Sequence, residues 1–140
     1  MVDPSHKGKA FPAYSFTVER GKVREFALAI DDPNPAYVAD DPAIPPTFPT
    51  VFAFWGPMTL EMILKEIDVE IFNVLHSEQE YEYNTPMKVG DTITVETQIS
   101  DIYTREGRSS KMDFIEFLTA YTNQNGDPVL NERALIIVRS

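Results

Sequence analysis

The stretch Thr92-Ile93-Thr94-Val95-Glu96-Thr97-Gln98-Ile99 sets the character of the second half of the chain. Every second residue from Ile93 to Ile99 is suited to a buried face, which is the period of a half-buried strand. The same alternation runs over residues 78–83, and β-favouring residues fill 111–122 and 129–138. Glycines at 107 and 126 lie in the intervening breaks, where tight turns need a positive φ. This half therefore predicts an antiparallel meander of long strands.

Two stretches of the first half carry a helical spacing instead. In each, apolar residues recur at i, i+3, i+4 and i+7, which places them on one face of a helix. The two sets are Val23, Phe26, Ala27, Ile30 and Leu60, Ile63, Leu64, Ile67. The first helix should end at Asp31-Asp32-Pro33, because proline disfavours the helical conformation of its predecessor. The second is predicted over residues 57–67. Helices that precede an antiparallel sheet indicate an α+β architecture.

The 140 residues fit one domain, which we expect over residues 11–140 after a flexible segment of residues 1–10. Apolar residues occupy both faces of the stretch 111–122, as Phe114 beside Ile115 and Phe117 beside Leu118 illustrate. Helices cover only one face of a sheet, so the other face needs a second cover. In a chain of this size another subunit can supply it, and we expect a dimer.

The net charge of −10 argues against a nucleic-acid ligand, since such a protein needs a basic face to neutralise phosphates. An anionic carrier of acyl groups would equally need a local basic patch or a partner chain. Arg105, Arg108 and Lys111 are the candidates for such a patch, with a solvated hairpin tip as the alternative interpretation.

The absence of cysteine fits a reducing compartment, and we expect a cytoplasmic protein. It also excludes disulfides, a cysteine nucleophile and a thiolate metal site. No apolar run is long enough to span a membrane, so no membrane association is expected. The two histidines, His6 and His76, are far apart in sequence and predict neither a metal site nor a cofactor.

The most polar turn of the chain is Asp32-Pro33-Asn34-Pro35-Ala36-Tyr37, directly after the first predicted helix. It resembles the Asp-x-Asn-Pro-x-His motif of the (R)-specific enoyl thioester hydratases and MaoC-like dehydratases. The resemblance implies that Asp32 takes the position of the catalytic aspartate, with Asn34 inside the motif. Tyr37 stands at the position of the catalytic histidine. The alternative is that Asp32 and Asn34 only stabilise the turn, as such side chains often do.

The resemblance extends over residues 11–139, through the stretches 76–83, 86–91, 105–109 and 122–127. These are similar to the fatty-acid-synthase-I-like dehydratase branch, and to the non-catalytic subunit of mycobacterial (3R)-hydroxyacyl-carrier-protein dehydratases. The family implies a hot-dog fold, an antiparallel sheet wrapped around a central helix at about 57–67. It further implies an acyl-CoA or acyl-carrier-protein thioester as ligand and acyl sites at a dimer interface.

The tyrosine at position 37 decides what the resemblance implies for activity. Histidine, with an ordinary pKa of about 6.5, serves as acid or base at neutral pH, whereas tyrosine titrates near 10 and is a poor base. Asp32 would act without its usual partner. We therefore predict a hydratase/dehydratase-family protein that works as a subunit, in a homodimer or with a MaoC-like homologue. The alternatives are a non-enzymatic acyl-thioester binding protein and a hot-dog thioesterase.

The predicted substrate-binding residues are Phe54, Trp55, Gly56 and His76. Phe54 and Trp55 belong to an aromatic run that can line an acyl tunnel, a dimer surface or ordinary core. The resemblance implies that the backbone N–H of Gly56 polarises a thioester carbonyl at the start of the central helix, although the family's His-Gly pair is Trp-Gly here. His76 either approaches the acyl site or forms a structural hydrogen bond.

Overall fold

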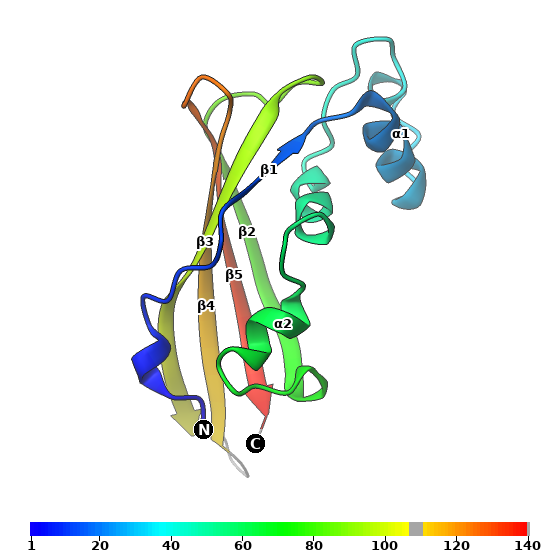
Figure 1. The fold of residues 1–140 in the computed structure, drawn as a ribbon. Coiled ribbons are helices and arrows are strands. Elements are labelled where there is room, and N and C mark those ends of the chain that lie inside the picture. The colour runs from blue at the N-terminus through cyan, green and yellow to red at the C-terminus, as the bar shows by residue number, and fades with distance from the viewer. Residues whose placement is uncertain (107–110, 140) are drawn as a thin grey trace.

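The computed structural model describes residues 1–106 and 111–139, which form a five-stranded antiparallel sheet with helices on one face (Figure 1). The strands are β1 (Tyr14–Thr17), β2 (Val74–Tyr83), β3 (Thr92–Glu106), β4 (Lys111–Thr122) and β5 (Pro128–Arg139), in the order β1-β3-β4-β5-β2. The predicted meander is confirmed for β3, β4 and β5. β2 departs from it, because it crosses the sheet to pair with β5.

The turns between the strands follow the expected chemistry where they are described. Gly126 has a φ of 82° and its N–H donates to the carbonyl of Asn123 at 2.9 Å, which closes the turn from β4 to β5. The turn at Gly107, together with Arg108 of the candidate basic patch, lies outside the described residues. Arg105 stacks on the rings of Tyr103 and Phe114 at 5.1 and 5.2 Å. Its guanidinium therefore covers aromatic surface.

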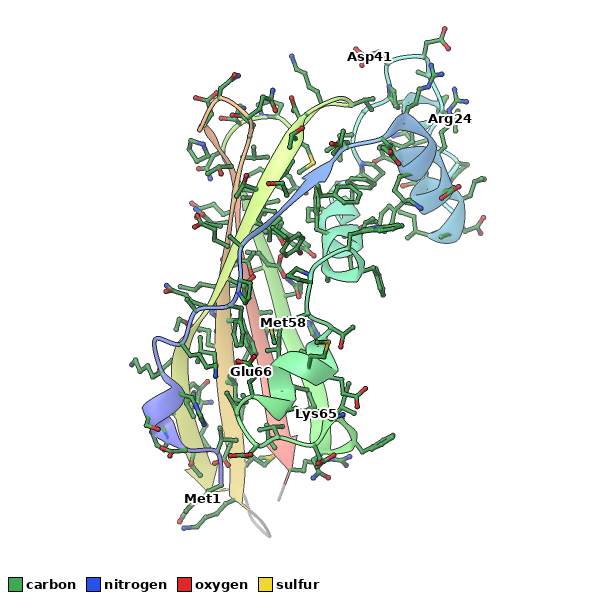
Figure 2. All side chains as sticks on the ribbon, in the orientation of Figure 1. Met1, Arg24, Asp41, Met58, Lys65 and Glu66 are labelled. Carbon is green, nitrogen blue, oxygen red and sulfur yellow. The ribbon has the colours of Figure 1, made fainter. Side chains whose placement is uncertain are left out.

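The helices are α1 (Arg20–Ala29) and α2 (Leu60–Lys65), with short 3-10 segments η1 (Pro4–His6), η2 (Pro35–Tyr37), η3 (Phe48–Phe54) and η4 (Ile71–Asn73). α1 lies beyond the end of the sheet, whereas η3 and α2 lie over its face (Figure 1). Arg24 donates from α1 to the carbonyl oxygen of Val38 at 2.7 Å and so holds the following loop against the helix (Figure 2).

The central helix, expected over residues 57–67, is shorter than predicted. Thr59 begins it, since its hydroxyl accepts a hydrogen bond from the N–H of Met62 at 3.3 Å. Asp68 ends the turn after it with a φ of 56°, while the N–H of Val69 returns to the carbonyl of Leu64 at 3.0 Å. This left-handed closure leaves a helix of six residues, fewer than two turns, at the sheet.

Two hydrophobic clusters cover the helix-facing side of the sheet, here called the inner face. The first cluster packs α1 and η3 against one end of the strands, and the second packs α2 and the N-terminal segment against the other. The members of the first are Val18, Val23, Phe48, Val51, Phe52, Met87, Ile93, Val95, Tyr121, Val129 and Leu130. Those of the second are Val2, Phe11, Leu64, Ile67, Val69, Ile99, Ile102, Ile115, Phe117 and Ile136.

The segment of residues 1–10, which we expected to be flexible, is docked against β3 and β4. The buried Val2 donates its N–H to the carboxylate of Asp113 at 2.7 Å. The N–H of Gly8 donates to the carbonyl of Ile99 at 2.8 Å, and Ile99 returns a bond to Lys9 at 2.9 Å. These backbone bonds satisfy part of an exposed strand edge, which explains why a polar segment packs here.

The opposite side of the sheet, the outer face, is partly covered by the chain itself. Phe114 is buried by stacking on Tyr103, with ring centroids 5.0 Å apart, whereas Leu118 keeps 39% of its surface exposed. Arg133 binds the carboxylates of Glu116 at 2.6 Å and Glu78 at 2.8 Å. The need for a second cover, from which a dimer was expected, is therefore smaller than the sequence implied.

Candidate functional site

A cavity of about 350 Å³ lies between the inner face of the sheet and the segments η3 and α2 with the residues that join them. Its walls are predominantly apolar, and Met58, which lies where the chain enters α2, contributes to them (Figure 2). The lining residues come from every strand: Phe11, Pro12, Tyr14, Pro49, Thr50, Ala53, Pro57, Met58, Leu60, Ile63, His76, Gln79, Tyr81, Val95, Thr97, Phe117, Thr119, Tyr121, Glu132, Ala134 and Ile136.

A row of polar side chains crosses the floor of this cavity at right angles to the strands. Thr97, Thr119, Glu132 and Tyr81 are direct cross-strand neighbours on β3, β4, β5 and β2, and we call them the polar row. The hydroxyls of Thr97 and Thr119 are 2.9 Å apart. On β4, Thr119 has Tyr121 of the first cluster on one side and Phe117 of the second on the other. The row thus separates the two clusters.

Glu132 is the acceptor at which two hydrogen-bonding paths meet. The hydroxyl of Tyr121 donates to its Oε2, and Nε2 of Gln79 donates to its Oε1 at 2.7 Å. Oε1 of Gln79 lies 2.9 Å from Nε2 of His76. An amide oxygen only accepts, so His76 is the donor of that bond. The resulting chain runs from the exposed His76 through Gln79 to Glu132.

Burial fixes the protonation of the tyrosines around the cavity. It raises the pKa of Tyr121, with a further contribution from the charge of Glu132, so this phenol stays protonated and donates. Burial likewise raises the pKa of Tyr14 to about 12. The hydroxyl of Tyr14 donates to the carbonyl of Phe52 at 2.9 Å, which fixes its ring in the cavity wall.

The Asp31–Tyr37 turn lies away from the cavity and serves the local backbone. Asp31 has a φ of 54°, its N–H donates to the carbonyl of Leu28, and the N–H of Asp32 donates to that of Ala27. This pair of bonds is a Schellman closure of α1. Oδ1 of Asp32 then accepts from the N–H of Asn34, and Oδ1 of Asn34 accepts from that of Ala36, each at 3.0 Å.

Three predicted catalytic residues are therefore outside the cavity floor. Asp32 and Asn34 are exposed and hold the turn, whereas the ring of Tyr37 is buried, with 9% of its surface exposed. Among the residues that line the cavity none comes from this turn. The geometry within this chain matches the turn-stabilising alternative.

The predicted substrate-binding residues divide between two places. His76 lines the cavity, but Phe54 and Trp55 are 81% and 55% exposed and line a separate shallow hollow beside α1. Lys22 lies over the Trp55 ring at 5.2 Å from its centroid. Gly56 packs against the cavity wall, since a Cβ there would lie 3.0 Å from Cε1 of Tyr14. Gly56 precedes α2 by four residues and so is not at its first turn.

Sequence reasoning missed the residues that give the cavity its polarity, Glu132, Gln79 and Tyr121. Gln79 alternates with glutamates in a predicted strand, so the alternation could have predicted that it faces the inner side of the sheet. The inward position of Glu132 could not be predicted. Glu132 and Arg133 are adjacent charged residues on opposite faces of β5, and the sequence does not show which of them faces the cavity. Within residues 1–106 and 111–139, no three carboxylate or imidazole side chains are grouped to hold a metal ion. In the same residues, the helices are too short to span a bilayer.

Comparison with known proteins finds similarity over nearly the whole chain. Residues 5–132 match the family described as FAS1-like, dehydratase domain region. The "UPF0336 protein" of Thermobifida fusca is 33% identical over an alignment that covers 99% of this chain and 94% of that protein. A protein of the same name from Streptomyces avermitilis is 27% identical over an alignment that covers 99% of this chain and 96% of that protein.

Solved structures show the fold. The HadBC (3R-hydroxyacyl-ACP dehydratase) complex of Mycobacterium tuberculosis matches with a TM-score of 0.76 and 22% identity, over 94% of this chain and 96% of that one. The ChsH1-ChsH2 complex of the same organism matches with a TM-score of 0.74 and 16% identity, over 94% of this chain and 84% of that one. A MaoC-like dehydratase of Rhodospirillum rubrum matches with a TM-score of 0.66 and 18% identity, over 95% of this chain and 92% of that one. The hot-dog fold expected from the sequence is thereby confirmed.

Proposed function

Because the chain belongs to the FAS1-like dehydratase family, we propose that it is the acyl-thioester-binding subunit of a hydratase or dehydratase whose acid–base residues come from a hot-dog partner. One observation carries the proposal. The apolar cavity on the sheet is separate from the Asp31–Tyr37 turn that should hold the catalytic groups.

The cavity has the properties of a site for an acyl chain. Its volume is in the range of small-molecule sites, and its walls include Met58, Ile63, Phe117 and Ile136. The remainder of a thioester ligand, a coenzyme A or a carrier-protein arm, is anionic. With a net charge of −10 this chain repels it, so the partner subunit is the better source of cations.

The motif lacks the chemistry that a complete hydratase needs. Tyr37 stands where an imidazole would act near neutral pH, and Oδ1 of Asp32 is engaged by the N–H of Asn34. Removing one general acid–base group typically lowers a rate by about 10² to 10⁴. A partner with an intact Asp-x-Asn-Pro-x-His motif would supply the missing groups.

The free edge of β2 supports a different chain as the partner. Gln79 and Tyr81 face the cavity, so Glu78, Glu80 and Glu82 point to the outer face, where Arg133 binds the first two. In a symmetric antiparallel pairing of two β2 strands, opposed residues share a face. The glutamate row would then meet its own copy, and like charges in that position destabilise pairing.

The deciding experiment measures hydration of crotonyl-CoA and 2-octenoyl-CoA by the purified chain, by a MaoC-like homologue from the same organism, and by the mixture. We expect turnover of octenoyl-CoA to appear or rise strongly only in the mixture. Hydration by this chain alone would contradict the subunit proposal. Intact octanoyl-CoA binding without turnover in any sample would favour a non-enzymatic binding protein, and release of free coenzyme A would favour a thioesterase.

The edge argument has its own test in the triple variant E78Q/E80Q/E82Q. We expect it to self-associate more strongly than the wild type in analytical ultracentrifugation at low salt. The matched control E19Q/D41N/E96Q removes the same charge from exposed positions off β2 and should behave as the wild type. Equal self-association of the two variants would show that net charge, and not the β2 row, sets the choice of partner.

A further inference from the structure

The carboxylate of Glu132 lies in a cavity whose walls are predominantly apolar. Along β5 it stands between Leu130, which belongs to the first hydrophobic cluster, and the cavity residue Ala134. Placing a carboxylate in such surroundings costs free energy unless it is well bonded. A leucine at this position would join the two clusters at less cost, so packing does not account for Glu132.

The bonds of Glu132 leave acceptor capacity on a side chain that lines the cavity. A carboxylate has about four lone-pair sites on its two oxygens. Tyr121 occupies one site on Oε2 and Gln79 one site on Oε1, so each oxygen retains a free site. Both partners hold the carboxylate from fixed positions on β4 and β2, which orients the oxygens before any ligand arrives.

We propose that the polar row binds a hydrogen-bond donor, a hydroxyl or an amide N–H, on an otherwise apolar ligand chain that crosses it. The inference rests on the proposed function and deepens it, by naming the class of acyl thioester that the cavity prefers. Glu132 accepts the donated bond, while the hydroxyls of Thr97 and Thr119 beside it are bonded to each other. An ether, a ketone or a plain methylene at the same point gains nothing from a group that only accepts.

Two small probes test this donor preference without any thioester. 1-Octanol and methyl heptyl ether have similar size and polarity, but only the alcohol donates a hydrogen bond. Binding of each is followed by NMR shift perturbation in the wild type. A hydrogen bond to a charged group predicts that the alcohol binds about tenfold more tightly. Equal binding of the two probes, or binding of neither, would overturn the inference.

Variants assign the preference to Glu132. E132Q should lose it, because an amide both donates and accepts, whereas Glu116→Gln on the outer face should retain it. Y121F removes one donor from Glu132 and frees a further acceptor site, so the preference should persist or increase. Should E132Q fail to fold, Y121F still decides, since loss of the preference in that variant contradicts the inference.

Octanoyl-CoA separates the two sources of a donor and the two proposals. If the donor is an amide of the carrier arm, E132Q weakens binding of octanoyl-CoA itself. If it is a hydroxyl on the acyl chain, E132Q weakens the binding only of hydroxyoctanoyl-CoAs. Two of these, with the hydroxyl at carbon 3 and at carbon 8, are titrated beside octanoyl-CoA. Octanoyl-CoA binding without a donor preference defeats this inference alone, and absence of octanoyl-CoA binding defeats the proposed function.

Discussion

The Asp31–Tyr37 turn and the polar row of the cavity both carry carboxylate and phenol groups, but they use them in opposite ways. In the turn, the side chains of Asp32 and Asn34 each accept from a backbone N–H two residues away. In the polar row, the groups come from four strands, and their bonds run across the sheet: Thr97 to Thr119 within the row, and Glu132 to Gln79 on β2. Groups that meet only through tertiary contacts retain sites for a ligand, whereas the turn satisfies its own backbone.

Asp68 shows that the first region needs no catalytic role to explain it. It has a φ of 56°, close to the 54° of Asp31, and it closes the turn after α2 as Asp31 closes α1. No motif surrounds Asp68. Aspartate tolerates this left-handed conformation better than most residues, so the same physical demand selects it at both helix ends.

The largest effect is expected where the cavity is filled. Ala134→Phe places a ring where an acyl chain would lie, and displacing about three methylene groups at about 0.8 kcal/mol each predicts a roughly fiftyfold loss of octanoyl-CoA affinity. Ala120→Phe, on the exposed side of β4, is the matched control and should bind normally. Calorimetric titration measures both. Unchanged octanoyl-CoA binding by Ala134→Phe would show that the acyl chain does not bind in this cavity.

A smaller effect, on stability, is expected at the turn. Asp31→Val should lower the free energy of unfolding by about 1–2 kcal/mol, because a β-branched residue resists a positive φ. Asp31→Gly should leave it equal or higher. Urea unfolding measures both, and Asp68→Val should show a similar loss. A functional loss without a loss of stability in Asp31→Val would reverse the assignment of the turn.

Gly56 tests whether its role lies in packing. Gly56→Ala brings a Cβ to 3.0 Å from the Tyr14 ring, which must shift, so we expect about 1 kcal/mol less stability and weaker ligand binding. Gly21→Ala, with open space around it in α1, should instead be neutral or stabilising. Thermal unfolding compares the two. Full stability with a selective loss of turnover in the assembled enzyme would restore a role for the Gly56 N–H.

The smallest effect is expected for the substitution that restores the family motif. Tyr37→His should leave the isolated chain without hydration of 2-octenoyl-CoA, since Asp32 stays bonded within its turn and neither residue lines the cavity. Tyr37→Phe serves as the control for loss of the hydroxyl. Measurable hydration by Tyr37→His above that control would mean that the turn and the cavity form one site.

The sequence predicted the elements well where a periodic pattern repeats locally. The expected end of the first helix at Asp31 agrees with α1, and the long strands fall where alternation placed them. The second helix was overestimated, because Leu60 to Ile67 keep helical spacing through a closing turn. The residues of the predicted catalytic motif do not line the cavity, for a different reason. A motif of adjacent residues records what a turn contains, not what it faces.

What the sequence by itself determined is the set of local structures and, through the whole-length pattern, the dehydratase family. The spacing of apolar residues and the conformational preferences of aspartate and proline act over a few residues, so they can be recognised from the sequence alone. Only the tertiary structure decided the cavity. Pairing of β2 with β5 brings Gln79 to Glu132 across 53 residues, and a contact over such a distance depends on strand order, which local physics does not specify.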